Sequence, residues 1–231
     1  MIPTMIPNGI DMYHGDNHDD DGLSDVDLTA KFAQIYQSGI FWIMHKVTQG
    51  VTIIDPKFQR RRACAKAAGF KFFGGYHFLS VDDPIAQAKF FLENCHDDGV
   101  MCFAADFEKP SKNPNTWPAL HQLKTFMQYV DANTNTARCK IYGSDLIREV
   151  LKPPTGGHIA PNMQDAIDFF HMPDLWLAEY GPHENAPWPW TRERVWAWQY
   201  SDDGHIAPLF GKLDLNFFAG SEHDLSYRWR I

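Results

Sequence analysis

Residues 70–79 read FKFFGGYHFL, a run in which apolar and aromatic side chains occupy nearly every position. Residues 41–47, FWIMHKV, have the same character. A strand that is apolar on both of its faces is typical of a parallel sheet covered by helices. These two stretches therefore predict an α/β protein whose strands are buried on both sides.

Strand-like and helical patterns alternate along the rest of the chain. Strands are expected at residues 8–12, 41–48, 71–79, 101–108, 138–143, 174–180, 195–200 and 213–217. Amphipathic helices are expected at residues 25–38, 55–68, 84–94 and 117–132. Eight strands with helices between most of them favour a single barrel of the (β/α)₈, or TIM, type over an open sheet. Residues 152–174 and 181–194 are rich in Pro, Gly and Trp, so helices in the last third are expected to be short or missing.

The composition fits one folded domain and argues against several classes of protein. The 231 residues are 44% hydrophobic and 14% aromatic, which is enough for a sizeable core and too apolar for a disordered chain. The formal net charge of −8 argues against nucleic acid as the main partner. No apolar run approaches the roughly 18 residues of a membrane span. Residues 1–9 lack the positive charge and apolar stretch of a signal peptide. We expect a soluble, cytoplasmically made, single-domain protein over residues 1–231.

The four cysteines, Cys64, Cys95, Cys102 and Cys139, lie in apolar surroundings without CxxC spacing. Free, buried thiols in a reducing compartment are the expected state. A disulfide between Cys95 and Cys102 is the alternative that their short separation leaves open.

The sharpest polar pair is Asp106 and Glu108, in MCFAADFEKP at residues 101–110. In a barrel of this type the active site lies at the carboxyl ends of the strands. Side chains two apart on a strand share a face, about 6.6 Å apart along the backbone. Two carboxyl groups this close repel, so the pKa of one is raised while the other stays ionised, which supplies a general acid beside an anion. The alternative is a structural pair held by Lys or Arg at the rim.

Two further carboxylates, Asp11 in NGIDMYHG and Asp214 in GKLDLNFF, end the first and the last predicted strands. These strands are neighbours in a closed barrel, so both side chains are expected in the same cavity as Asp106 and Glu108. Taken alone, each could equally cap a loop. The other polar residues at predicted strand ends are Lys46, His77, Tyr142, Glu179 and Gln199.

The order of motifs resembles glycoside hydrolase family 25, the Chalaropsis-type lysozymes or N-acetylmuramidases, which include phage endolysins and bacterial autolysins. Nearly the whole chain takes part. The motifs are GIDMYHG, HKVTQGVTIIDPKF, CAKAAGFKFFGGYHF, AQAKFF, AADFE, KIYG, LWLAEYG and WAWQYSDDGHIAPLFGKLDLNFF. The most specific feature is a D-x-E strand followed much later by W-Q-Y and D-L-N.

The resemblance implies a lysozyme that cleaves the β-1,4 bond between N-acetylmuramic acid and N-acetylglucosamine in peptidoglycan, with retention and with help from the substrate's acetamido group. It places the catalytic groups on Glu108, Asp106, Asp11 and Asp214, with Glu108 as the general acid. Together with the strand-end positions, it places substrate contacts on Tyr76, Lys46, Tyr142, Trp176 and Gln199.

We expect a monomer that needs no metal or organic cofactor, and we expect no separate wall-binding domain because the 231 residues leave no room for one. The partner that the resemblance implies is bacterial cell-wall peptidoglycan, reached after lysis or dedicated export. A chitinase-like glycosidase is disfavoured because Ala104 stands where that family has a further aspartate. A non-catalytic sugar-binding barrel is disfavoured because Glu108 is present. A phage endolysin, an autolysin and an interbacterial effector remain open.

Three other features have structural explanations. Arg60, Arg61 and Arg62 fit a solvated helix face. Residues 17–22 resemble the start of a calcium loop, but Leu28 stands where the bidentate glutamate is needed. The tryptophans of the last third are expected in the core, with one or two lining a sugar-binding groove. They are Trp176, Trp188, Trp190, Trp196 and Trp198.

Overall fold

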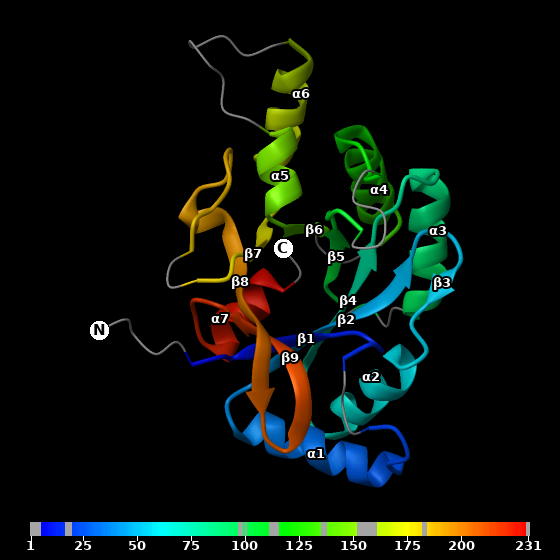
Figure 1. The fold of residues 1–231 in the computed structure, drawn as a ribbon, viewed down its shortest axis with the longest axis vertical. Coiled ribbons are helices and arrows are strands. Elements are labelled where there is room, and N and C mark those ends of the chain that lie inside the picture. The colour runs from blue at the N-terminus through cyan, green and yellow to red at the C-terminus, as the bar shows by residue number, and fades with distance from the viewer. Residues whose placement is uncertain are drawn as a thin grey trace.

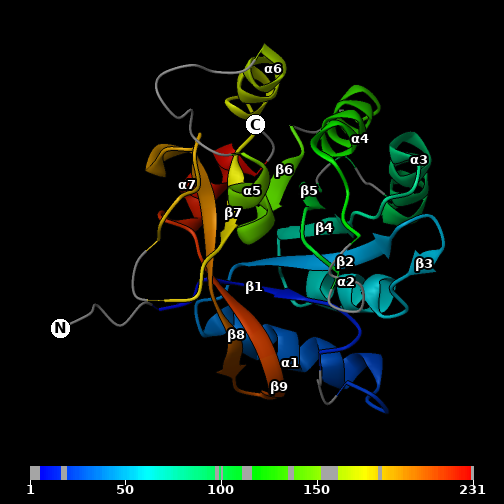
Figure 2. The ribbon, with the colours of Figure 1, turned by 45° about the horizontal axis from the view of Figure 1, so that its top comes forward.

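The computed structural model describes residues 6–16, 20–96, 99, 101–110, 116–134, 138–151, 161–181 and 184–229. Eight of its strands close into a barrel (Figures 1 and 2). In barrel order they are β1 (Gly9–Met12), β2 (Trp42–Gln49), β4 (Phe72–Phe78), β5 (Phe103–Asp106), β6 (Lys140–Gly143), β7 (Leu175–Ala178), β8 (Val195–Ile206) and β9 (Leu209–Phe217). A short strand, β3 (Ile53–Ile54), pairs with the end of β2. The predicted closed α/β barrel is therefore confirmed.

Helices cover the outside of the barrel and follow most of its strands. They are α1 (Asp25–Gln37), α2 (Phe58–Ala67), α3 (Pro84–Cys95), α4 (Leu120–Ala132), α5 (Asp145–Val150), α6 (Pro161–Phe170) and α7 (Glu222–Arg228). The predicted start of α1 is confirmed, because the side chain of Ser24 accepts a hydrogen bond from the backbone N–H of Asp27. Between β7 and β8 the only described helix is the 3₁₀ turn Arg192–Arg194, as expected. α6 is longer than we expected, with ten residues.

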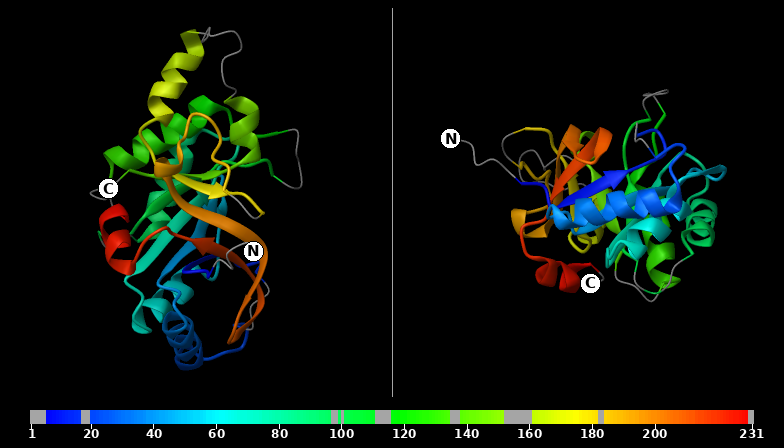
Figure 3. Two further views of the ribbon diagram at one scale, coloured as in Figure 1. Left: turned by 90° about the vertical axis from the view of Figure 1, so that its left-hand side faces the viewer. Right: turned by 90° about the horizontal axis from the view of Figure 1, so that it is seen from below.

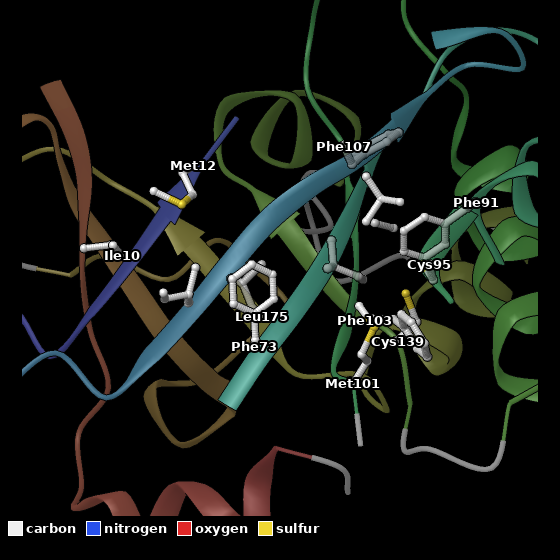
Figure 4. Close-up of a cluster of buried hydrophobic side chains, with 14 of the residues drawn as sticks. Ile10, Met12, Phe73, Phe91, Cys95, Met101, Phe103, Phe107, Cys139 and Leu175 are labelled. Carbon is white, nitrogen blue, oxygen red and sulfur yellow. The ribbon is translucent and has the colours of Figure 1, made fainter. Parts of the chain in front are cut away.

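Alternation along each strand separates two cores. One set of side chains points outward against the helices; Figure 4 shows Phe91 and Cys95 of α3 facing Phe103 of β5. The other set fills the barrel interior, where Trp42 is fully buried. A Cβ atom at Gly9 would lie 1.9 Å from the Trp42 ring, so the indole needs a glycine on the neighbouring strand.

The barrel interior is apolar at one end and polar at the other. At the amino-terminal end, Leu225 of α7 and Trp229 just after it pack into the interior core; α7 is the red helix near the C-terminus in Figure 3. Trp229 packs against Phe72 and Trp196, at ring-centroid distances of 5.4 and 5.8 Å. The functional side chains must therefore come from the opposite end, where the parallel strands terminate.

The last strand differs from a regular (β/α)₈ barrel in its direction. β9 is antiparallel to both β8 and β1, while the other barrel neighbours are parallel. Asp214 consequently lies within β9 and not at its carboxyl end. It still reaches the mouth, because it stands directly opposite Asp11 in the β1–β9 register.

We expected three consecutive arginines of α2 to face solvent, and this expectation is wrong for two of them. Arg61 is 1% exposed and forms a salt bridge with buried Asp20, Nε to Oδ2 at 2.7 Å. Arg62 is also buried and donates to the backbone oxygen of His96. Arg60 reaches Asp25 at the surface. Arg61 turns inward because the loop after β1 supplies the carboxylate of Asp20 and the carbonyl of Tyr13. The acceptor of Arg62 is instead a carbonyl at the end of α3.

Two expectations about the chemistry of the chain can also be compared with the structure. All four cysteines are free and buried, as predicted, so the Cys95–Cys102 disulfide is absent. Among the described residues no helix is long and apolar enough to cross a membrane. The calcium-like segment lies partly outside the described residues, since residues 17–19 are not among them.

Candidate active site

Asp106 and Glu108 leave β5 at the mouth of the barrel. β5 ends at Asp106, two residues earlier than predicted. The strand geometry nevertheless continues, because the N–H of Phe107 donates to the carbonyl of Tyr142 on the next strand, at 2.9 Å. Phe107 packs outward in the helix-facing core, so the two acids keep a common inward face. Asp106 is 4% exposed and lies deeper, whereas Glu108 is half-buried.

Both acids have raised pKa values. Burial, followed by the charge of Glu108, raises the pKa of Asp106 well above its ordinary value, against the opposing effect of Lys46. Burial and the charge of Asp145 raise the pKa of Glu108 to about 7. We expected a raised pKa for only one acid of the pair; the pKa values of both rise, because desolvation acts on both groups.

Asp106 also carries an unsatisfied acceptor. Its Oδ1 atom is buried and has no hydrogen-bond partner among the described residues. A buried acceptor without a donor is costly in a folded protein unless a ligand satisfies it. A substrate N–H or O–H would supply the missing donor.

Lys46 lies beside this pair on β2. Its Nζ atom donates to Oε1 of Gln49 at 2.7 Å and sits 4.9 Å from the centre of the Phe78 ring. Burial lowers the pKa of Lys46, while the charges of Asp106 and Asp55 act in the opposite direction. Lys46 is thus the cation that faces the deeper acid.

Asp11 and Asp214 form the second group of acids at the mouth. Oδ2 of Asp11 accepts hydrogen bonds from Nε2 of Gln199 at 2.9 Å and from Nδ2 of Asn216 at 2.7 Å. Burial and the charge of Asp214 raise the pKa of Asp11 well above its ordinary value. Burial and the charge of Asp16 raise the pKa of Asp214 to about 7. The structure therefore brings together all four predicted acids.

The aromatic residues predicted to contact substrate form the floor of this site. Tyr76 and Tyr142 are buried, and their rings pack on Trp176 at centroid distances of 6.0 and 4.5 Å. Trp176 is only 1% exposed, so it has no free face for a sugar, contrary to our expectation. Its Nε1 instead donates to Oδ1 of Asn216 at 2.7 Å.

Two tyrosines at the mouth are more exposed than the tryptophans of the last third. Trp190, Trp196 and Trp198 are buried, and Trp188 is half-buried. Tyr13 and Tyr180 are 39% and 54% exposed. Of these aromatic residues, Tyr180 is the one that lines a cavity beside Glu108.

A cavity of about 410 Å³ opens beside Glu108. Its lining includes Ser144, Asp145, Glu179 and Tyr180, from the ends of β6 and β7 and the start of α5. Arg148 of α5 forms a salt bridge with Glu179 at 2.6 Å. This cavity places room for a ligand next to the acid whose pKa is about 7.

His77, which we expected at a strand end, does not face the site. Its ring lies between Thr48 and Gln87, with ring-nitrogen contacts of 2.7 and 3.1 Å. Burial lowers the pKa of His77 to about 4. Among the described residues no group of three or more His, Cys, Asp or Glu is arranged to hold a metal ion.

Sequence reasoning missed three side chains of the site. Asn216 stands two residues after Asp214, so the alternation of β9 already placed it on the same face. Asp145 lies two residues after the end of β6, at the first position of α5. Tyr180 lies just beyond β7, in a motif whose tryptophan attracted attention instead.

An α/β barrel with acidic pairs of raised pKa at its mouth has the architecture of a glycoside hydrolase. The model of the family described as "Glycosyl hydrolases family 25" matches residues 10–209. The chain belongs to this family.

Relatives agree with that assignment. The autolytic lysozyme of Clostridium acetobutylicum is 24% identical over 214 residues, which cover 91% of this chain and 55% of the relative. The chain thus spans about half the length of that curated relative. The lysozyme of Streptomyces coelicolor has a TM-score of 0.74 at 20% identity, with 98% of each chain covered. A muramidase from Acremonium alcalophilum has a TM-score of 0.70 at 24% identity, covering 96% of this chain and 97% of that one. The structural likenesses establish the shared fold.

Proposed function

We propose that the protein is an N-acetylmuramidase, which hydrolyses the β-1,4 bond between N-acetylmuramic acid and N-acetylglucosamine in peptidoglycan. The observation that carries this proposal is the unsatisfied, buried Oδ1 of Asp106 beside Glu108. An acetamido N–H of the substrate is a donor that this oxygen can accept. Glu108, with its pKa of about 7, holds a proton for the leaving oxygen at neutral or lower pH.

The proposed reaction retains the anomeric configuration in two steps. In the first, Glu108 gives its proton to the glycosidic oxygen while the substrate's own acetamido carbonyl oxygen attacks the anomeric carbon, and the bond to the leaving sugar breaks. Asp106 orients the acetamido group through its N–H. In the second step, Glu108 takes a proton from water, whose oxygen attacks the anomeric carbon and opens the cyclised intermediate.

A covalent alternative uses the same residues. Asp106 would then attack the anomeric carbon itself and form a glycosyl ester. The depth of Asp106, which is 4% exposed and lies further down the barrel than Glu108, favours the orienting role. Asp11 and Asp214 would hold sugar hydroxyls and the charge of the site. Tyr76, Tyr142, Lys46 and Gln199 would shape it.

Mass spectrometry of muropeptides released from purified walls tests the bond that is cut. Muramic acid at the new reducing ends supports the proposal. Glucosamine at those ends would make the protein a glucosaminidase, and intact glycan strands would remove the glycosidase assignment altogether, in favour of a sugar-binding barrel.

Two small molecules separate the mechanisms. A thiazoline that mimics the cyclised intermediate is expected to inhibit the enzyme. A 2-fluoro glycoside that leaves a mass-shifted peptide containing AADFEK would instead identify Asp106 as a covalent nucleophile. We further propose that one chain is sufficient, which sedimentation of the active enzyme tests, and that the wall is reached after lysis or export.

A further inference from the structure

Asp11 and Asp214 stand directly opposite each other on antiparallel strands. The register of β1 and β9 pairs these two residues. Directly opposed side chains on one face have Cβ atoms about 4.5–5.5 Å apart. Both carboxyl groups point into the barrel mouth, so they are within reach of each other, and their charges interact.

One oxygen of Asp11 is fully used by amide donors. Gln199 and Asn216 both donate to Oδ2 of Asp11, at 2.9 and 2.7 Å. Asp11 is 3% exposed and Asn216 is fully buried, so water does not replace these bonds.

The amide of Asn216 cannot turn round. Its Oδ1 accepts from Nε1 of Trp176 at 2.7 Å, and an indole nitrogen can only donate. Oε1 of Gln199 accepts from the hydroxyls of Tyr142 and Tyr180 at 2.8 and 3.0 Å. Both amide nitrogens point toward Asp11, and Asn216 is the one whose orientation its partner fixes.

A carboxyl oxygen that already faces two N–H groups has no room for a proton of its own. A proton on Asp11 must then lie on Oδ1. We propose that Asp11 and Asp214 act as a carboxyl pair that shares one proton, and that Asn216 is the positioning residue that directs this proton toward Asp214. Asp11 is consequently not a proton donor to the substrate, and the partly exposed Asp214 carries the single negative charge of the pair.

The charges around the pair agree with this arrangement. Among the described residues the charges that raise the pKa values of the two carboxyls from outside the pair are those of Asp16, Asp202 and Glu108. All three disfavour a second negative charge on the pair. The hydrogen bonds from Gln199 and Asn216 favour the first. The tyrosines near the pair carry no charge, because burial and the acids raise their pKa values; they are Tyr13, Tyr76, Tyr142 and Tyr180.

The catalytic role of this carboxyl pair rests on the proposed glycosidase function. The cleavage passes through a transition state with positive charge at the anomeric carbon. A pair with one proton supplies one fixed negative charge across a wide pH range. A neutral pair would supply none, and a doubly ionised pair would be too costly to bury.

The first test is the pH profile of kcat/KM for Asn216→Asp. This variant keeps an acceptor for Trp176 but removes the donor to Asp11 and adds a carboxyl group. The acidic limb, where the pair loses its first proton, is expected to move up by about one to two pH units.

Asn8→Asp is the matched control. Oδ1 of Asn8 accepts from Nε1 of Trp42 at 3.1 Å, which is the same amide–indole bond at the opposite end of the barrel. The control can lose stability but is expected to leave the acidic limb in place. An unmoved limb in Asn216→Asp, or an equal shift in Asn8→Asp, would overturn the positioning role.

The second test does not depend on which bond the enzyme cuts. Carboxyl carbons of the wild-type protein, labelled with carbon-13 in aspartate, are followed by NMR as the pH changes. Asp11 and Asp214 are expected to titrate together in two separated steps, and Asp214→Asn is expected to remove one step and shift the other. Independent single-step titrations at ordinary aspartate values would refute the pair, even if the muramidase assignment held.

Discussion

The side chains of the mouth show how neighbours decide what a carboxyl group can do. Glu108 is half-buried next to Asp145, and its pKa rises to about 7. Asp20 is 1% exposed but bonded to Arg61 and Lys57, and its pKa falls far below its ordinary value. The first environment suits an acid that must give up a proton near neutral pH, and the second suits a permanent anion that holds structure.

Glu108→Gln is expected to lower kcat by roughly 10²–10⁴-fold, the range of general acid catalysis. The amide has almost the same shape, so the fold should remain. Release of reducing ends from purified walls measures the loss. Glu93→Gln, a change at an exposed position of α3, serves as control. Activity near wild type in Glu108→Gln would move the acid role to another carboxyl group.

Asp145→Asn is expected to lower the pKa of Glu108, because it removes the like charge that helps to raise it. The enzyme needs Glu108 protonated, so activity is lost as the pH rises through this pKa. The alkaline limb of kcat should therefore move to lower pH, by about half a unit to one unit. Asp168→Asn, at an exposed position of α6, should leave the limb unchanged. Equal profiles for both variants would contradict the assignment.

At the scale of elements, the loop after β1 is held by buried charges on α2. Nη1 of Arg61 donates to the carbonyl of Tyr13 at 2.9 Å, while its Nε reaches Asp20 at 2.7 Å. Asp55 accepts from the backbone and ring nitrogens of His14, at 2.8 and 2.9 Å. These contacts fix the segment that carries Tyr13 to the mouth.

Arg61→Ala is expected to destabilise the protein by about 3–5 kcal/mol, because it leaves the buried carboxylate of Asp20 with reduced compensation. The neighbouring Arg60→Ala removes a surface ion pair and should cost about 0–1 kcal/mol. Urea unfolding at neutral pH measures both. Similar midpoints for the two variants would show that the buried pair is not what holds the loop.

How far the sequence predicts these elements depends on the range of the interactions involved. Strands such as Phe72–Phe78 follow from local apolar patterns, and the D-x-E pair follows from alternation along one strand. The inward turn of Arg61 does not, because its acceptors on Asp20 and Tyr13 come from another loop. The sequence indicates the antiparallel direction of β9 only weakly. Residues 201–212, between the two predicted strands, show no helical pattern. A parallel strand after β8 would need a crossover helix in this segment.

In the molecule as a whole, the acids at the barrel mouth reduce the stability that the two hydrophobic cores provide. The acids Asp11, Asp106, Glu108 and Asp214 all have pKa values raised by burial. Each such group binds its proton more tightly in the folded state than in the unfolded state. Ionisation of these acids therefore lowers the free energy of unfolding. Acids with cationic partners, such as Asp20, have the opposite effect, because their ionisation stabilises the folded state.

The stability of the wild-type protein is accordingly expected to fall as the pH rises from 5 to 8. For Glu108 the window lies between its ordinary value of 4.5 and about 7, where the folded state keeps a proton that the unfolded state has lost. A shift of this size corresponds to about 3 kcal/mol, or roughly 6–12 °C in Tm for a chain of this length. Glu108→Gln removes the titrating group. Calorimetry should therefore show a smaller fall in Tm for this variant, which would be more stable than wild type at pH 8 although it is inactive. Parallel Tm curves for the two proteins would mean that Glu108 ionises in the folded protein as easily as in water.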